Sequence, residues 1–247
     1  MPIPIRQHEP TSDPEYTIQW TDDGSATLVR GRDQAAFHSG CGAISECDHV
    51  YVGNGGFDGP TAQWPRHILE VGFGAGISML RTIRRVHAHS EPIEFHYVGL
   101  ESEPLSRSVL ESMHLDQCGS ERKLIDQFLE WWNDFSDQGM NESTWLVRPH
   151  CLVTIIRCDA AEFLKRTTRT FETVYFDPFD PATNPELWTT TVFAGLHRCL
   201  RPGGRLVSYC VKRQVQRDLT SVGFEVRCVP GPPGGKREVL LAIRQAG

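Results

Sequence analysis

The sequence predicts an α/β protein with a mostly parallel, seven-stranded sheet. From residue 67 onward, short apolar runs typical of strands alternate with segments of helical periodicity, the pattern of a sheet covered by helices on both faces. The last two apolar runs, 224–229 and 238–243, flank a turn rich in proline and glycine and are expected to pair antiparallel. At 247 residues the chain is long enough for one such domain with additions.

The first quarter of the chain has a different pattern. Residues 16–20 alternate apolar and polar side chains, a polar turn follows, and residues 26–30 run extended again, which predicts a hairpin. A short helix is expected at 43–52, before a glycine-rich turn. We therefore expect three parts: a disordered N-terminus at 1–14, a small β-rich extension at 15–64 and the main domain at 65–247.

Within the main domain, strands and helices are expected to alternate up to the closing pair. An insertion at 116–150 precedes the third strand and is rich in aromatic residues. The expected strands are 67–71, 94–100, 151–156, 171–176 and 205–211, and the expected helices are 76–86, 105–115, 123–135, 160–165, 185–200 and 214–222.

Composition and charge exclude several classes of protein. No apolar run approaches the roughly 18–20 residues of a membrane span, and the polar N-terminus resembles neither a signal peptide nor a transit peptide, so we expect a cytoplasmic protein with no membrane partner. The eight cysteines form no Cys-x-x-Cys pair and no cluster with histidine, so we expect neither a metal site nor disulfides. The net charge of −6 argues against nucleic-acid binding by bulk electrostatics, but it allows a local basic patch.

A glycine-rich loop is the strongest local signal for a ligand. Glu70, Gly72, Gly74 and Gly76 follow the first strand of the main domain and open a helix. Glycines at such a turn let the chain bend tightly and let a ligand approach the backbone. The acid at the strand end differs from the usual nicotinamide-binding pattern. This loop therefore favours a nucleotide-type cofactor other than a nicotinamide.

Two further acids follow the next strands. Glu101 ends the second strand, where a carboxylate can accept hydrogen bonds from both ribose hydroxyls. Asp159 follows the third strand and is placed to accept a hydrogen bond from an adenine amino group. Either acid could instead be an ordinary residue at a helix N-terminus, stabilised by the helix dipole. The order of the three features nevertheless favours cofactor binding.

The fourth strand ends at Asp177, which we expect to be the catalytic group. Ligands in such sheets bind outside the carboxyl ends of the strands, and a carboxylate there can orient an amine and stabilise positive charge on its nitrogen. Phe179 offers a flat surface on which a base can stack. The alternative is that Asp177-Pro178 forms only a turn and that Trp188 lies in the core.

Taken together, these motifs resemble the methyltransferase domain of the MnmC family, whose members methylate the aminomethyl group on the wobble uridine of certain tRNAs. The resemblance runs from about residue 20 to 243. It rests most specifically on Asn184-Pro-Glu-x-Trp188 and Gly235-Lys-Arg-Glu238. Other matching segments are Asp23-Gly-Ser25, Phe37-His-Ser39, Gly42-Ala43 with Glu46, Val50-Tyr-Val52, Glu70-Val-Gly-Phe-Gly-Ala-Gly76, Glu101-x-x-Pro104-Leu105, Asp159-Ala160, Asp177-x-Phe179-x-Pro181-Ala182 and Val215-x-Arg217-x-Leu219 with Gly223-Phe224.

The resemblance implies a Rossmann-like class I fold, S-adenosyl-L-methionine as cofactor, and conversion of 5-aminomethyl-2-thiouridine to its methylaminomethyl form. It places the cofactor on Glu70, the glycine loop, Glu101, Asp159 and Asp177, and the tRNA anticodon region near Lys236, Arg237 and Trp188. It also implies direct transfer to a neutral amine, without a metal. Because the oxidase half of the bifunctional enzymes has no counterpart here, other enzymes are expected to supply the aminomethyl precursor.

Departures from the family pattern leave alternatives open. Pro178 and Asp180 stand where family members often have glycine and alanine, so Asp180 either helps to bind a protonated amine or marks another substrate. The alternatives are a methyltransferase for another amine, such as adenine N6, or a non-catalytic cofactor-binding module. The insertion at 116–150 covers the cofactor, forms an interface or is an extra helix packed on the sheet. Basic residues that could contact tRNA cluster at Arg81, Arg84, Arg85, Arg198, Arg201, Lys212, Arg213, Arg217, Lys236 and Arg237.

Overall fold

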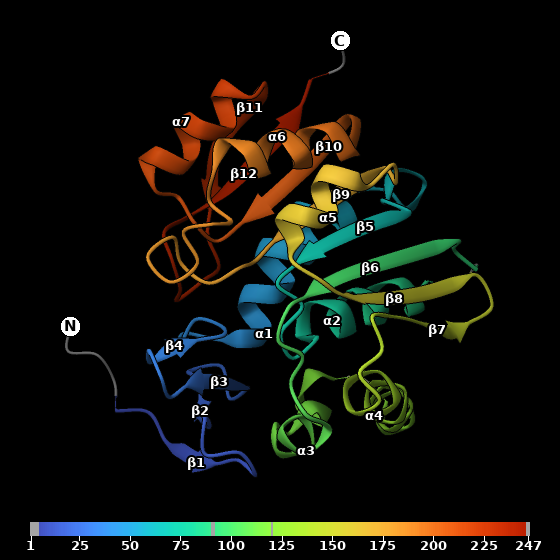
Figure 1. Ribbon diagram of the computed structural model, residues 1–247, viewed down its shortest axis with the longest axis vertical. Coiled ribbons are helices and arrows are strands. Elements are labelled where there is room, and N and C mark those ends of the chain that lie inside the picture. Colours follow the sequence, from blue (N-terminus) through green and yellow to red (C-terminus); the bar gives the residue numbers. More distant parts are fainter. Residues whose placement is uncertain (1–4, 90–91, 120, 246–247) are drawn as a thin grey trace.

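The computed structural model contains a large sheet and a small sheet, with the small one lying beside the carboxyl ends of strands in the large one (Figure 1). The structure describes residues 5–89, 92–119 and 121–245. The predicted α/β class is confirmed, but the large sheet has eight strands rather than seven. Its order is β11-β12-β10-β9-β5-β6-β8-β7. The strands are β5 (His67–Val71), β6 (Phe95–Glu101), β7 (Glu142–Arg148), β8 (Cys151–Arg157), β9 (Phe171–Phe176), β10 (Leu200–Ser208), β11 (Phe224–Pro230) and β12 (Glu238–Arg244).

The five central strands are parallel, and the two flanks are antiparallel. β5 pairs with β6 and β9, and the parallel order continues to β8 on one side and β10 on the other. β11 and β12 form the expected closing antiparallel pair. The eighth strand, β7, pairs antiparallel with β8 at the opposite edge and lies inside the 116–150 insertion. Sequence analysis missed it because its inward and outward faces do not separate apolar from polar residues: Ser143, Trp145 and Val147 face inward, whereas the apolar Leu146 is exposed.

The small sheet begins earlier than expected. Its strands run in the order β1-β2-β3-β4, and they are β1 (His8–Pro10), β2 (Tyr16–Trp20), β3 (Ala26–Arg30) and β4 (Ala35–Ala36). The predicted hairpin is present as β2 and β3. Residues 1–4 lie outside the described residues, but residues 8–10, which we expected to be disordered, pair with β2. Glu9 accepts a hydrogen bond from the indole of Trp20 at 2.6 Å, which helps to fix this edge strand.

Alternating side chains of the central strands pack into two hydrophobic cores, one on each face of the sheet. Ile68, Tyr97 and Tyr175 point into the larger core, while Leu69 and Val174 point into the other. The larger core is covered by α1 (Ala43–Glu46), the π-helix η1 (Cys47–Phe57), α2 (Ile77–His87), α3 (Arg107–Ser112), the 3₁₀ helix Leu115–Cys118 and α4 (Arg122–Asp137). The other core is covered by α5 (Ala160–Arg166), α6 (Thr190–Cys199) and α7 (Arg213–Ser221).

The insertion packs as an extra helix and strand. The indole of Trp132 in α4 donates to the carbonyl of Leu105 at 2.7 Å and stacks on Phe73 of the glycine loop, with ring centroids 5.2 Å apart. Trp131 stacks on Trp145 of β7 at 5.6 Å. These contacts bury the aromatic residues of the insertion against the sheet, beneath the glycine loop.

Candidate active site

A cavity of about 590 Å³ opens at the carboxyl ends of β5, β6, β8 and β9, where ligands bind in sheets of this kind. Residues of the small sheet form one of its walls, so the N-terminal extension helps to enclose it. Nine carboxylates and three basic side chains line the cavity. The carboxylates belong to Asp33, Glu46, Glu70, Glu101, Glu103, Asp159, Asp177, Asp180 and Glu186, and the basic groups to Arg30, Arg32 and Lys236.

The glycine loop closely approaches the end of β9, where Asp177 lies. Gly72 has a φ of +86°, in the left-handed region that favours glycine. A β-carbon at Gly72 would lie 2.6 Å from the carbonyl oxygen of Asp177, so any other residue would push the two loops apart. Gly74 lines the cavity, whereas Gly76 lies outside it, packs against Phe73 and begins α2.

Two of the predicted acids are held at the base of this loop. The Glu101 carboxylate accepts hydrogen bonds from the backbone N–H groups of Gly74 and Glu103, each at 2.9 Å. Glu70 is 1% exposed, and its Oε2 has no hydrogen-bond partner among the described residues. Burial raises the pKa of Glu101, and burial together with the charge of Asp177 raises the pKa of Glu70 well above its usual range. Both groups therefore favour a positively charged or donor-rich ligand.

Asp159 has both of the features that the sequence suggested. Its Oδ1 accepts a hydrogen bond from the backbone N–H of Glu162 at 3.1 Å, so it caps the N-terminus of α5. The side chain is also exposed and lines the cavity. Its position as a helix cap therefore leaves the second carboxylate oxygen available to a ligand.

Asp177 lies half-buried at the end of β9, in a cluster of polar side chains from distant segments. Tyr51 of the π-helix donates a hydrogen bond to its Oδ1. Glu46 lines the same cavity and is 5% exposed, with Oε2 accepting from the backbone N–H of Ser39 at 3.0 Å. The Nζ of Lys236 lies 3.9 Å from the centre of the Tyr209 ring. Burial and the charge of Glu46 raise the pKa of Asp177 well above its usual range, whereas Tyr51 and Lys236 act in the opposite direction.

Phe179 is held by the small sheet. The guanidinium of Arg30 lies 4.1 Å from the centre of its ring, and the Phe37 ring meets it nearly at right angles. Asp33 holds the same guanidinium through two hydrogen bonds, of 3.1 and 2.6 Å. One face of Phe179 is thus covered by Arg30, which limits base stacking to the rest of the ring.

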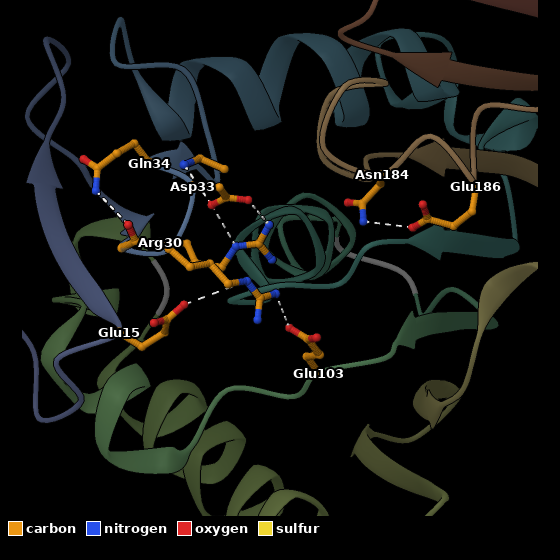
Figure 2. Close-up of polar contacts among 10 residues, drawn as sticks. Glu15, Arg30, Asp33, Gln34, Glu103, Asn184 and Glu186 are labelled. Atoms are coloured by element: carbon orange, nitrogen blue, oxygen red, sulfur yellow. Dashed lines mark hydrogen bonds and ion pairs between the residues drawn. The ribbon is translucent and has the colours of Figure 1, made fainter.

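Polar side chains surround the mouth of the cavity (Figure 2). On one side, Arg32 lies between Glu103, at 2.7 Å, and Glu15, at 3.9 Å, and so connects the small sheet to the loop after β6. On the other side, the Asn184 amide donates to Glu186 at 3.0 Å. Because both ion pairs of Arg32 are largely exposed, each is expected to contribute only about 0–1 kcal/mol, so the small sheet depends on packing rather than on these pairs.

Two residues that the resemblance placed near the tRNA do not line the cavity. Trp188 is 7% exposed, its indole donates to the carbonyl of Phe179 at 2.8 Å, and its ring packs 4.9 Å from Phe176. It therefore supports the loop from the core side. Arg237 is exposed and lies beside Lys236 in the turn between β11 and β12, outside the cavity.

Most of the basic cluster predicted from the sequence is used within the fold. Arg81 pairs with Asp48, Arg201 with Glu172 and Lys212 with Asp180, the last at 2.7 Å. Arg85 and Arg198 bind backbone carbonyls. Within the described part of the chain, the side chains of Arg213 and Arg237 are exposed and form no hydrogen bond or ion pair, so they remain free for a partner.

Comparison with known proteins identifies the family of this chain. A family model described as "S-adenosyl-L-methionine-dependent methyltransferase" matches residues 122–245, half of the chain. The chain belongs to this methyltransferase family. The residues present fit the cofactor, because Glu70 has an unpartnered buried oxygen suited to an ammonium group, and the backbone of Gly72 and Gly74 lines the cavity.

Curated relatives of this methyltransferase carry a more specific name. It is 31% identical over 225 residues to the tRNA 5-methylaminomethyl-2-thiouridine biosynthesis bifunctional protein MnmC of Cupriavidus metallidurans, a match that covers 90% of this chain and 33% of that protein. The MnmC protein of Delftia acidovorans is also 31% identical, over 236 residues, covering 95% and 35% of the two chains. The chain spans about a third of the length of these relatives.

Solved structures confirm the predicted class I methyltransferase fold. The structure superimposes on MnmC2 from Aquifex aeolicus with a TM-score of 0.71 and 21% identity, over 97% of this chain and 73% of that one. Spermidine synthase from Thermotoga maritima gives a TM-score of 0.58 at 17% identity, over 98% and 73%. Both comparisons show the arrangement of the fold, including the N-terminal extension.

A search for other kinds of site in the methyltransferase adds little. Among the described residues, no group of three or more His, Cys, Asp or Glu side chains is arranged to hold a metal ion. None of the described helices is long and apolar enough to cross a membrane.

Sequence analysis missed several groups that surround Asp177. Glu46 and Tyr51 lie in segments that match the family, but nothing in their local sequence indicates a contact with a residue more than 120 positions away. Tyr209 was likewise given no role, although its hydroxyl holds the carbonyl of Pro178 at 2.9 Å. Three-dimensional contacts, rather than any spacing, reveal these residues.

Proposed function

We propose that this methyltransferase acts on a primary amine, the 5-aminomethyl group of a tRNA wobble uridine, and converts it to the methylaminomethyl group. The observation that carries the proposal is the position of Asp177, half-buried beside the glycine loop with Glu46 and Lys236 on the same cavity. A strongly acidic cavity suits a substrate that arrives as an ammonium ion. The names of the relatives, tRNA 5-methylaminomethyl-2-thiouridine biosynthesis proteins, support the same substrate.

We assign the cofactor to the half of the cavity formed by the glycine loop. Gly72 and Gly74 allow its amino-acid portion to approach the backbone, with Glu70 below. Glu101 keeps free lone pairs for the ribose hydroxyls, and the second oxygen of Asp159 is available to the adenine amino group. When bound, the cofactor supplies an electrophilic methyl group on a sulfonium.

The chain's own residues act on the amine. Asp177 orients the nitrogen so that its lone pair points at the methyl carbon, and it stabilises the positive charge that grows on nitrogen. Pro178 and the hydrogen bond from Tyr209 to the Pro178 carbonyl hold the loop that carries it. Alignment is expected to supply the largest part of the rate enhancement, up to about 7–11 kcal/mol.

The acidic cavity cannot attract phosphates, so we infer that the tRNA backbone is bound outside it. Between residues 205 and 237 the sequence has seven Lys or Arg and two Asp or Glu, in a chain of net charge −6. This stretch carries α7 and the turn before β12, with the free Arg213 and Arg237 and with Lys236 at the cavity edge. Phosphate contacts there would position the anticodon while the modified base enters the cavity.

Labelled methyl transfer tests the proposal. Protein, labelled S-adenosyl-L-methionine and tRNA from cells that lack this modification activity are incubated, and the tRNA is then digested to nucleosides. The expected product is a labelled 5-methylaminomethyluridine, with or without the 2-thio group. Label on adenine would contradict the wobble-uridine substrate and would favour another amine. Cofactor binding without label on any nucleoside would contradict the assignment to tRNA.

A further inference from the structure

The π-helix Cys47–Phe57 belongs to the N-terminal extension but is anchored on the methyltransferase sheet. The carbonyl of Gly55 accepts a hydrogen bond from Thr173 of β9 at 2.8 Å, and that of Asn54 accepts one from Arg205 of β10 at 3.2 Å. Cys47 accepts a hydrogen bond from Ser78 of α2 at 3.3 Å. Three elements of the main domain therefore fix the position of this helix.

The helical register brings the side chains of Glu46 and Tyr51 toward the same side of the helical segment. Glu46 is the last residue of α1 and the N-cap of the π-helix, whose hydrogen bonds run from residue i to i+5, so Tyr51 follows Glu46 by about one turn. In an α-helix the same two positions would point about 140° apart. π-helical turns occur frequently at functional sites. Here the register allows Tyr51 and Glu46 to reach the same end of β9.

Glu46 and Tyr51 both lie in the environment of Asp177, but only Tyr51 forms a hydrogen bond to it. Glu46 lines the cavity, whereas Tyr51 is completely buried behind it and donates its hydroxyl to Asp177 Oδ1. Burial raises the pKa of Tyr51 well above its usual range, so its hydroxyl remains a donor. The titratable groups that act on Asp177 from all sides are Glu46 and Cys47, Tyr51, Glu70 of β5, Tyr209 after β10 and Lys236 before β12.

We propose that the N-terminal extension completes the amine site, with Glu46 as a second carboxyl group beside Asp177 and Tyr51 as a positioning residue that holds the Asp177 carboxylate. Tyr51 occupies Oδ1 and so leaves Oδ2 for the substrate. This inference rests on the proposed amine substrate, but the contacts that support it are made within the protein and need no substrate.

The carboxyl pair gives the amine a place to leave its proton. An alkylammonium nitrogen has no lone pair until one N–H bond breaks. Its proton passes to a carboxylate oxygen of the pair, forming an O–H bond, and the bonding electrons stay on nitrogen as the lone pair. The charge of Glu46, on the same cavity, raises the pKa of Asp177, so the Asp177 carboxylate accepts a proton more readily than an isolated one would. Asp177 and Glu46 together therefore turn a bound ammonium into a nucleophile without any other base.

The test is a pH titration of Asp177 in the whole protein, without substrate. The protein is labelled with ¹³C at aspartate carboxyl groups, and the Asp177 signal is assigned by its loss in Asp177→Asn. Removing the Tyr51 hydrogen bond in Tyr51→Phe is expected to move the titration midpoint up, by about one pH unit. Removing the Glu46 charge in Glu46→Gln is expected to move it down by a similar amount.

Tyr175→Phe is the matched control. Tyr175 is buried next to Tyr51, with ring centroids 5.4 Å apart, but its hydroxyl contacts Thr82 at 3.2 Å and not Asp177. This variant removes a buried hydroxyl from the same core and is expected to leave the Asp177 midpoint in place. Circular dichroism shows whether each variant is folded. If Tyr51→Phe does not fold, Glu46→Gln, which keeps the shape of the side chain, still tests the proposal.

The same variants are then compared for methyl transfer across pH. Because turnover needs ionised Asp177, the acid limb should move up in Tyr51→Phe and down in Glu46→Gln. On the acid side of the midpoint, a rise of one unit lowers turnover about tenfold. Equal midpoints in all variants, or a shift in Tyr175→Phe as large as in Tyr51→Phe, would overturn the proposal. The titration needs no substrate, so its result does not depend on whether tRNA is the substrate.

Discussion

The two halves of the cavity are built by different means. In the cofactor half, backbone N–H groups at the ends of neighbouring strands hold the acids: Glu101 accepts from Gly74, 27 residues earlier, and from Glu103, and Asp159 caps its own helix. In the amine half, Asp177 is surrounded by Tyr51, Glu46 and Lys236, which come from both ends of the chain. The first half is a set of local turns repeated along one sheet edge. The second exists only when the N-terminal extension and the β11–β12 turn are both in place.

This difference separates binding from turnover. Changes in the local turns should alter cofactor affinity, whereas changes around Asp177 should alter the chemical step. Gly72 is the exception, because its backbone touches that of Asp177 and so belongs to both halves. Three predictions test this separation, and we give them in order of expected effect.

Replacing the catalytic acid should have the largest effect. Asp177→Asn removes the charge that orients the amine, so kcat is expected to fall by about 10²–10⁴-fold. The dissociation constant of the cofactor, measured by calorimetry, should change little, because Glu70, Glu101 and Asp159 remain. Asp180→Asn is the matched control, because Asp180 lies three residues further along the same loop and its carboxylate pairs with Lys212 at 2.7 Å. Full turnover in Asp177→Asn would contradict our assignment.

A substitution at Gly72, where the two halves of the cavity meet, should give the second-largest effect. Gly72→Ala places a β-carbon against the Asp177 carbonyl and forces alanine into the left-handed region. We expect a loss of about 1–3 kcal/mol in the free energy of unfolding, with weaker cofactor binding and lower turnover together.

Gly24→Ala separates the cost of the left-handed backbone from the cost of the contact with Asp177. Gly24 has a similar φ of +82°, but a β-carbon there meets nothing within 4 Å. It should therefore show only the backbone cost, about 1–2 kcal/mol, with normal cofactor binding. Equal cofactor affinities in the two variants would show that the contact between Gly72 and Asp177 is unimportant.

The smallest effect is expected outside the cavity. Arg237→Glu should raise the KM for tRNA several-fold, leave kcat and cofactor binding nearly unchanged, and lower the slope of log binding against log salt by about one. Lys123→Glu makes the same charge change on exposed α4, far from the β11–β12 turn (Figure 1). Identical salt slopes for both variants would place the phosphate contacts elsewhere.

Local motifs explain how much of the site could be predicted from sequence. The alternation of strands and helices was enough to place the glycine loop, Glu101, Asp159 and Asp177 at one sheet edge, because the ends of parallel strands converge there. The same reasoning gave the closing antiparallel pair. Each of these depends on residues close together in the chain.

The remainder depends on contacts that no periodicity encodes. The role of Tyr51 follows from a π-helical register, whereas the sequence suggested only a short helix ending at residue 52. The covering of Phe179 by Arg30 depends on how the small sheet docks. The basic cluster was overestimated because sequence cannot show that Arg81 and Arg201 are already paired within the fold.

The stacking of Phe73 on Trp132 has an optical consequence. Phe73 sits between two glycines of the loop and lines the cavity, while Trp132 is completely buried beneath it. Any movement of the loop changes the surroundings of an indole ring that is otherwise shielded from water. The protein thus contains a fluorophore beneath the glycine loop, and the part of the tryptophan emission that Trp132→Phe removes, from one of six tryptophans, should report loop movement without an added dye.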